Sequence, residues 1–497
     1  MKRLGFLLIS CLFLSNVYGQ TLHGYEFKIQ IKGLADTTLY LGHHYGSAQY
    51  VIDTVPVNSK GEAIFTSTDT LPGGVYLVVI PTLKNKYFEM LVSGTEPKIS
   101  METDTVDFIK NMRISGSLEN TIFYEDLNFI ASKKDKMTQL KKEMDLVGET
   151  TEEGKKIKAE MKAVNAEVEA YREDNFNKYP DLLYTKFLKA ATDIKIPEAP
   201  INPDGTKDST FALRYVRQHY FDNFDFSDER LLRSNLYDTR IKKYIKDYIV
   251  KMPDSIMVAV DFIIGKSSIK PKTFQYVTVL LLNEYATSKI MGFDAIYVHI
   301  VDKFYTGGKA FWLDDVGLYR IQAQADKVRP TLLGKKGQPL VLQDTSGVDI
   351  PLYSLNSRFT VIVFWSPDYE KKKKEMPKIE SFYPELQQLG AEVYAVYSED
   401  EFDKWKTWLR GHKYPWINVC NAKGTEQYQL KYNVDQTPMI YLLDKNKITT
   451  SKNPFFNLEI KTSKNLIPIP KHWLNKKKYL HLKRGIESTT YILPEYI

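Results

Sequence analysis

Thiol chemistry in this chain depends on two residues, Cys11 and Cys420, which are its only cysteines. A reactive cysteine needs a stabilised thiolate, and disulfide exchange usually needs a second cysteine to resolve the mixed disulfide. Cys11 lies in an apolar N-terminal stretch typical of an export signal, so the mature chain would keep Cys420 alone. A single cysteine cannot form an internal disulfide. We expect Cys420 to be a small buried side chain, since unpaired cysteines are among the most buried residues.

The other polar clusters lack the spacing that a metal or catalytic site requires. His43 and His44 are adjacent in a β-type run, so their side chains face opposite sides of a strand. The acidic stretch 222–229 lacks the glycine and closing glutamate of a calcium loop, and we expect Ser227 or Asp228 to cap a helix there. No phosphate loop, zinc-ligand spacing or serine elbow is present in the sequence. We therefore expect no metal and no cofactor.

Residues 359–377, FTVIVFWSPDYEKKKKEMP, combine a buried strand with an unusual helix start. An apolar β-branched run ends at Trp365, a Ser-Pro-Asp turn follows, and a lysine-rich helix carries Pro377. Four consecutive lysines at 371–374 occupy the positive end of the helix dipole, and each costs on the order of a few tenths of a kcal/mol. They are either solvated charges of no function or a basic patch suited to an acidic peptide or polysaccharide.

Alternating β and α units continue on both sides of this stretch, from about residue 330 to about residue 450. The sequence predicts a hairpin near 340–355, strands at 359–365, 392–397, 416–419 and 439–443, helices at 368–389, 401–411 and 424–432, and a short closing strand. This alternation indicates a sheet with a mainly parallel centre and helices on both faces.

This last domain resembles the TlpA/ResA-like, AhpC/TSA-type branch of the thioredoxin superfamily. The residues that carry the resemblance are VIVFW at 361–365, EMP at 375–377 and QTPMIYLLD at 436–444. The resemblance implies a thioredoxin fold in which Pro438 is a cis-proline and Thr437 its partner. In such proteins the proline loop faces the active-site turn and hydrogen-bonds an extended chain. By resemblance, the ligand-binding groove here would include Trp365, Tyr369, Thr437 and Pro438.

The same resemblance implies redox cysteines eight and five residues before the helix proline, and this chain has Tyr369 and Lys372 there. Tyr369 has no thiol to act as a nucleophile, and Lys372 cannot resolve a mixed disulfide. We therefore expect no catalytic residues and a non-catalytic binding or scaffold protein, with an extended peptide or an envelope protein as the partner in the groove. The alternative is a thiol-disulfide oxidoreductase that acts through Cys420 or a partner's thiol. A third interpretation is that the groove is filled by Tyr369 and the domain only packs with its neighbours.

The upstream chain divides into a β part and a helical part. Residues 20–105 contain six short runs of period two, separated by turn residues, and predict an antiparallel β-sandwich. Residues 106–328 are helical, beginning with a hairpin whose apolar stripes run from Met137 to Val147 and from Ile157 to Tyr171. The expected order is a signal at 1–19, a β-sandwich at 20–105, an α-helical domain at 106–328, an α/β thioredoxin-like domain at 329–455 and a basic tail at 456–497.

The N-terminal 19 residues have the charged start, apolar segment and small-residue cleavage site of a secretory signal. A lipoprotein signal with acylated Cys11 is the alternative. Either places the protein in the periplasm, on the cell surface or outside the cell, and we expect no membrane span after the signal is removed, because no other apolar run is long enough.

The net charge of +7 is concentrated at the two ends of the chain. Residues 451–497 contain nine Lys and Arg against three acidic residues, so the body is close to neutral and we expect no nucleic-acid partner. Three prolines, at 454, 468 and 470, interrupt the tail where the fold needs a final helix. The tail is either a genuine basic extension or a degraded terminus.

Overall fold

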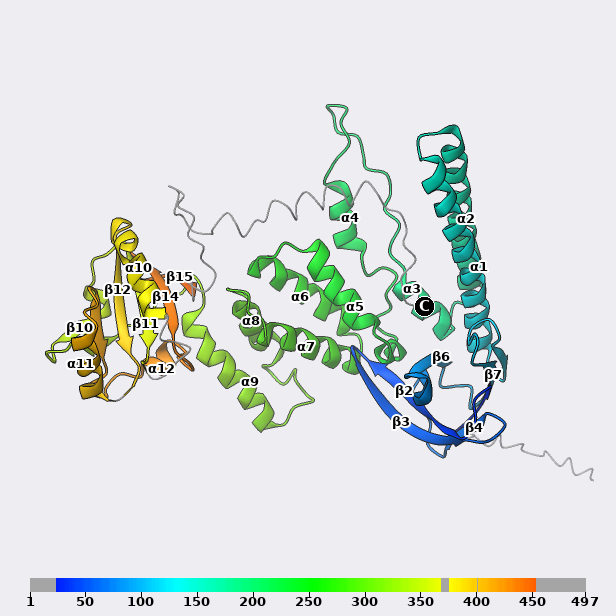
Figure 1. The fold of residues 1–497 in the computed structure, drawn as a ribbon, viewed down its shortest axis with the longest axis horizontal. Helices are drawn as coiled ribbons and strands as arrows, with labels where there is room; N and C mark the ends of the chain where they lie inside the picture. The colour runs from blue at the N-terminus through cyan, green and yellow to red at the C-terminus, as the bar shows by residue number, and fades with distance from the viewer. Residues whose placement is uncertain (1–23, 368–374, 400, 453–497) are drawn as a thin grey trace, which may run out of the picture. The chain divides into compact units, whose positions relative to one another are not determined.

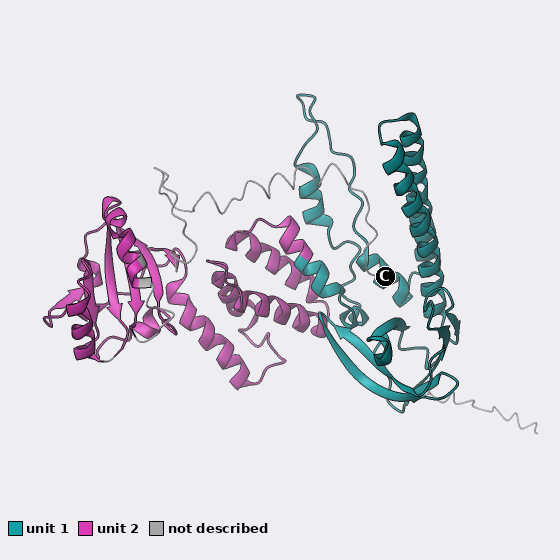
Figure 2. Ribbon diagram, viewed as in Figure 1, with its two compact units in different colours: residues 1–242 teal, residues 243–497 magenta. Residues whose placement is uncertain are grey.

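The computed structural model describes residues 24–367, 375–399 and 401–452. These residues form two compact units, which divide between Lys242 and Lys243 (Figure 2). The two units are described separately below.

The first unit begins with two four-stranded sheets (Figure 1). One sheet has the order β4-β1-β7-β8, with bounds Glu62–Ser67, Tyr25–Lys32, Lys98–Asp104 and Arg113–Ser115. The other has the order β3-β2-β5-β6, with bounds Ala48–Val57, Thr37–Tyr45, Gly74–Ile80 and Lys86–Val92. Alternate residues of β1 are buried, as the period-two pattern predicts.

Two details of these sheets differ from the sequence prediction. The β1–β7 pair is parallel, which is possible because the second sheet intervenes between these strands and provides the long connection that parallel neighbours need. Strand β3 was not among the predicted runs, because Tyr50, Val51 and Ile52 are consecutive exposed apolar residues and give no alternation.

The helices of this unit follow the sheets. They are α1 (Leu118–Val147), α2 (Glu152–Lys178), α3 (Leu183–Ala191), α4 (Phe211–His219), the 3-10 turn η2 (Glu229–Arg233) and α5 (Leu236–Lys243). The predicted hairpin is confirmed, because Leu140, Met144, Ile157 and Val164 form the buried seam between α1 and α2.

Side chains of α1 fasten it to its neighbours in the unit. The amide of Asn120 accepts a hydrogen bond from the Leu91 N–H at 2.8 Å and donates one to the Leu91 carbonyl at 2.7 Å. Both backbone groups belong to the edge strand β6, so Asn120 takes the place of a further strand. Arg172 of α2 donates to the buried carboxylate of Asp126.

The second unit starts with helices and ends with an α/β sheet. Its helices are η3 (Tyr244–Tyr248), α6 (Pro253–Ser267), α7 (Pro271–Ala286), α8 (Asp294–Phe304), α9 (Asp315–Val328) and η4 (Arg329–Thr331). Lys452, in the last described strand, donates to the Asp294 carboxylate of α8. No helix among residues 24–367, 375–399 and 401–452 has the length and apolar character needed to cross a membrane.

The sheet of this unit has the order β10-β9-β13-β12-β11-β14-β15. Its strands are β9 (Val341–Gln343), β10 (Asp349–Pro351), β11 (Phe359–Trp365), β12 (Ala391–Tyr397), β13 (Ile417–Cys420), β14 (Met439–Asp444) and β15 (Thr449–Lys452). The β11–β12 and β12–β13 pairs are parallel, as predicted for the centre of the sheet. Its helices are η5 (Leu352–Ser354), α10 (Glu375–Gln388), α11 (Phe402–Gly411) and α12 (Tyr428–Lys431).

Strand β11 builds both cores of this sheet because its side chains alternate between the two faces. Val361, Val363 and Trp365 join one cluster, with residues of α10 and α11. Ile362 and Phe364 join the other. The fold class expected from the sequence is therefore confirmed: β-sheets, a helical middle region and a thioredoxin-type α/β sheet.

Candidate functional site

Two segments expected to form the groove are brought together by the pairing of β11 and β14. The strands are antiparallel, with Phe364 opposite Met439. Trp365 follows Phe364 and Pro438 precedes Met439, so Trp365 and Pro438 lie at the same end of this strand pair. The bond between Thr437 and Pro438 is cis, as the resemblance implies.

The proline loop has unused backbone hydrogen-bonding groups. Thr437 and Pro438 are half-buried. Within the described ranges, no backbone hydrogen bond involves the N–H or the carbonyl of Thr437. Backbone groups of this kind can pair with an extended chain, which is how peptides add to an exposed strand.

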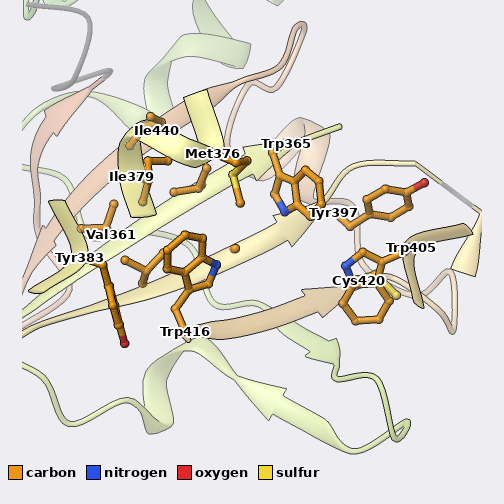
Figure 3. Close-up of a cluster of buried hydrophobic side chains, with 13 residues drawn as sticks. Val361, Trp365, Met376, Ile379, Tyr383, Tyr397, Trp405, Trp416, Cys420 and Ile440 are labelled. Carbon is orange, nitrogen blue, oxygen red and sulfur yellow. The ribbon is translucent and has the colours of Figure 1, made fainter. Parts of the chain in front are cut away.

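Trp365 lies beneath the surface of this region. Its side chain is 2% exposed and packs against Tyr397, with the ring centroids 5.7 Å apart (Figure 3). The ring centroid of Tyr414 lies 6.2 Å away. Its indole N–H has no acceptor among the residues that the structure describes. In this arrangement Trp365 supports the end of β11 from inside the core.

Tyr369, Lys372 and the lysine run 371–374 lie outside the described residues. The structure therefore places two of the four expected groove positions, Thr437 and Pro438, at a half-buried loop, and a third, Trp365, in the core.

Glu399 is a polar residue of this region that the sequence reasoning missed. Ser366 and Tyr397 donate hydrogen bonds to its carboxylate, and Lys404 forms an ion pair with it at 3.5 Å. Glu399 follows the carboxyl end of β12, and Ser366 follows the carboxyl end of β11. Because parallel strands bring their carboxyl ends to one edge of a sheet, the predicted strand pattern could have revealed this pair.

Cys420 is the last residue of β13, opposite Tyr397 of β12. It is 2% exposed and belongs to the same hydrophobic cluster as Tyr397 and Trp405 (Figure 3). Burial raises the pKa of its thiol to about 12. The expectation of a small buried side chain is confirmed, and the raised pKa keeps the thiol protonated at neutral pH.

A cavity of about 410 Å³ lies elsewhere in the thioredoxin-type domain. Its walls include Asp344, Ile350, His412, Tyr414 and Trp416, from the β9–β10 hairpin and the segment between α11 and β13. Trp365, Thr437 and Pro438 do not line it. The proline loop therefore lies outside this cavity.

The acidic stretch of the first unit is structural. Asp228 caps η2 by accepting a hydrogen bond from the Arg230 N–H, as expected. Asp225 pairs with Lys186 at 3.0 Å. The aromatic residues around them form one buried group, Phe221, Phe224, Phe226 and Tyr237. Among the described residues, no group of three or more His, Cys, Asp or Glu side chains could hold a metal ion.

Three known sequence families match the β part, the helical part and the α/β part of the chain in turn. Residues 333–451 match the AhpC/TSA family, residues 25–123 match a domain of unknown function (DUF4369), and residues 149–330 match another (DUF5106). A thiol-disulfide oxidoreductase ResA of Bacillus cereus is 28% identical over 124 residues, which cover 24% of this chain and 69% of that protein.

Similar solved structures include thioredoxin-like proteins. A thioredoxin-like protein from Bacteroides caccae is 18% identical, with a TM-score of 0.40, over 58% of this chain and 99% of that one. A domain of a possible thiol-disulfide isomerase from Cytophaga hutchinsonii is 26% identical, with a TM-score of 0.24, over 32% of this chain and 97% of that one.

The tail matches a different family. Residues 442–497 match a domain of unknown function (DUF382). Splicing factor 3B subunit 2 of Mus musculus is 42% identical over 48 residues, and the chain spans only 6% of that protein's length. The match therefore describes the tail alone.

The AhpC/TSA match agrees with the order of the sheet and with the cis-proline, whereas the sequence has no cysteine pair. The chain carries an AhpC/TSA thioredoxin-like domain related to ResA/TlpA-type oxidoreductases, preceded by DUF4369 and DUF5106 domains.

Proposed function

We propose that this protein is a non-catalytic binding protein of the cell envelope, in the periplasm or at the cell surface, whose thioredoxin-like domain holds an extended peptide segment. The observation that carries the proposal is the state of Cys420. It would be the only cysteine of the mature chain, and it is buried with a pKa raised to about 12.

Disulfide exchange needs a thiolate that can reach a substrate disulfide. Cys420 has neither property, because its sulfur lies in an apolar cluster and its thiol stays protonated at neutral pH. Conversion of the old redox site into a binding site keeps the fold and loses only the chemistry.

The proline loop supports the choice of an extended peptide as the ligand. Thr437 and Pro438 are half-buried, and the backbone of Thr437 has no partner within the described ranges. A peptide that lies across this loop can pair with these groups whatever its own side chains are. The envelope location rests on the predicted export signal.

The proposal is tested by insulin-disulfide reduction with the mature protein and with the Tyr369→Cys/Lys372→Cys double variant. We expect the natural protein to be inert and the double variant to gain activity, because the variant restores a cysteine pair at the positions given by the resemblance. The Cys420→Ala variant is the matched control and should behave as the natural protein does.

Two results would count against the proposal. Reduction of insulin by the natural protein, lost in Cys420→Ala, would establish the oxidoreductase alternative. A folded double variant without activity would mean that the groove no longer admits an extended chain.

A further inference from the structure

The β-sheets of the first unit contain a small pocket that is unrelated to the proline loop. Its volume is about 190 Å³. Its walls include Tyr25, His43, Ile52 and Tyr76 from four strands, together with Asp69 and Arg233. This volume is below the range of sites for drug-sized molecules, so the pocket suits a ligand smaller than those.

Arg233 reaches this pocket because two glycines make room for η2. A Cβ atom on Gly74 would lie 2.4 Å from Cβ of Arg233, and one on Gly73 would lie 2.8 Å from Cδ of Arg230. Any side chain at Gly74 would therefore displace Arg233, and the positive φ of Gly74, 158°, also disfavours one. The close approach of η2 to β5 therefore requires glycine at positions 73 and 74.

The two arginines of η2 differ in their partners. The Arg230 guanidinium is held by Asp228 through hydrogen bonds of 2.9 and 2.7 Å. Arg233 has no hydrogen bond or ion pair with any residue that the structure describes. Its charge does act on its surroundings, since it opposes the rise that burial gives to the pKa of Tyr76 and of Tyr45. Arg233 is therefore a half-buried cation that is left available at a pocket wall.

The pocket also offers an available anion. Asp69 is exposed, and only its backbone N–H is engaged, by the Ser67 hydroxyl at 3.0 Å. Its carboxylate forms no ion pair within the described ranges, so it does not lie within 4.0 Å of the Arg233 guanidinium. Two opposite charges that share a pocket without neutralising each other favour a ligand with both charges.

Apolar and aromatic groups fill the rest of the wall. His43 lies between Tyr50 and Tyr76, with ring centroids 5.9 and 5.7 Å away, and Ile52 is 41% exposed at the mouth. Tyr76 is fixed by a hydrogen bond of 2.6 Å from its hydroxyl to the Pro72 carbonyl. These groups can contact an apolar side chain.

We propose that this pocket binds a free α-amino acid with an apolar side chain. Its carboxylate would pair with Arg233, its ammonium group with Asp69, and its side chain would pack between Tyr25, His43 and Ile52. A dianion such as phosphate fits less well, because the pocket has one cation and one anion.

Calorimetric titration of the full mature chain tests the proposal with three probes: L-leucine, leucinamide, which lacks the carboxylate, and 4-methylpentanoate, which lacks the ammonium group. We expect L-leucine to bind and each analogue to bind about tenfold more weakly or worse, because a charge-assisted pair is lost.

Two variants then assign the charges. In Arg233→Gln, L-leucine should bind no better than leucinamide, and in Asp69→Asn no better than 4-methylpentanoate. A variant that only disturbed the fold would weaken all three probes alike. Arg113→Gln, at an exposed residue of β8, removes the same charge and should leave L-leucine binding unchanged.

The proposal is overturned if the folded natural protein gives no saturable heat with L-leucine, or if L-leucine binds equally to the natural protein and to both pocket variants. Asp69→Asn keeps the test decisive if Arg233→Gln does not fold, because Asp69 is an exposed residue that forms no ion pair with any described residue.

Discussion

At the scale of single residues, the chemistry of Cys420 is set by its neighbours. A thiol at the end of a strand is reactive when a cation or a helix N-terminus stabilises its thiolate. Cys420 instead lies in an apolar cluster with Tyr397 and Trp405, and burial raises its pKa to about 12. Its identity as a cysteine therefore says little about its role.

We predict that Cys420 does not react with an aromatic disulfide reagent in the native protein at pH 8, and that one thiol reacts once the protein is unfolded. The measurement is the released thiolate with and without denaturant. Rapid reaction of one thiol in the folded protein would contradict the burial of Cys420. The Cys420→Ala variant supplies the baseline.

Glu89 of β6 is the second residue whose titration is set by burial. Burial raises the pKa of its carboxyl from 4.5 to about 7, and its carboxyl has no hydrogen-bond partner among the described residues. Below pH 4.5 both the folded and the unfolded chain bind this proton. Between pH 4.5 and 7 the unfolded chain loses this proton while the folded chain keeps it. The folded state therefore becomes less stable relative to the unfolded state as the pH rises from 4.5 through 7.

We predict that Glu89→Gln removes this loss. We compare the unfolding free energy of the variant with that of the natural protein at each pH. The difference should favour the variant by about 1–3 kcal/mol more at pH 8 than at pH 4. Denaturant unfolding at the two pH values measures the change. Glu160→Gln, at an exposed residue of α2, is the control and should show no such pH dependence. If both substitutions changed the pH dependence of the unfolding free energy equally, the raised pKa of Glu89 would not be its cause.

At the scale of elements, α3 depends on a residue from another helix. Its N-cap, Leu182, has no side chain that can accept a hydrogen bond. The Glu119 carboxylate of α1 accepts hydrogen bonds from the N–H groups of Leu183 and Tyr184, at 2.8 and 2.9 Å. Glu119 is 2% exposed, so it performs the capping role from a helix that lies far away in sequence.

We predict that Glu119→Ala lowers the unfolding free energy of this unit by about 2–4 kcal/mol, because two buried N–H groups lose their acceptor. Chemical denaturation of the variant measures the loss. Glu160→Ala removes the same charge from an exposed face of the hairpin and should change stability little. A similar loss in both variants would mean that charge, not capping, is responsible.

At the scale of the whole molecule, stability comes from packed cores, with no disulfide among the described residues. Those residues include one cysteine, Cys420, and it is unpaired. A disulfide would contribute about 2–4 kcal/mol, which reducing agents would remove.

We predict that dithiothreitol leaves the thermal unfolding midpoint of the mature protein unchanged. Differential scanning calorimetry with and without the reductant measures this, with Cys420→Ala treated in the same way. A lower midpoint in the reduced natural protein would reveal a disulfide, either between molecules or with Cys11 in a chain that keeps its leader.

Features that depend on local patterns could be predicted from the sequence. Period-two runs and turn residues predicted most strands, apolar stripes predicted the hairpin of α1 and α2, and the residues around Trp365 and Pro438 predicted a thioredoxin-type sheet.

Which of these residues share an environment depends on how the elements pack in three dimensions. The burial of Cys420, the desolvation of Glu89 and the capping by Glu119 depend on residues that lie far away in sequence. Arg233 and Asp69 are also far apart in sequence, and they line one pocket because η2 packs on β5. Local sequence patterns record the backbone conformation and the buried face of an element, whereas pKa values and site geometry depend on what packs against that face.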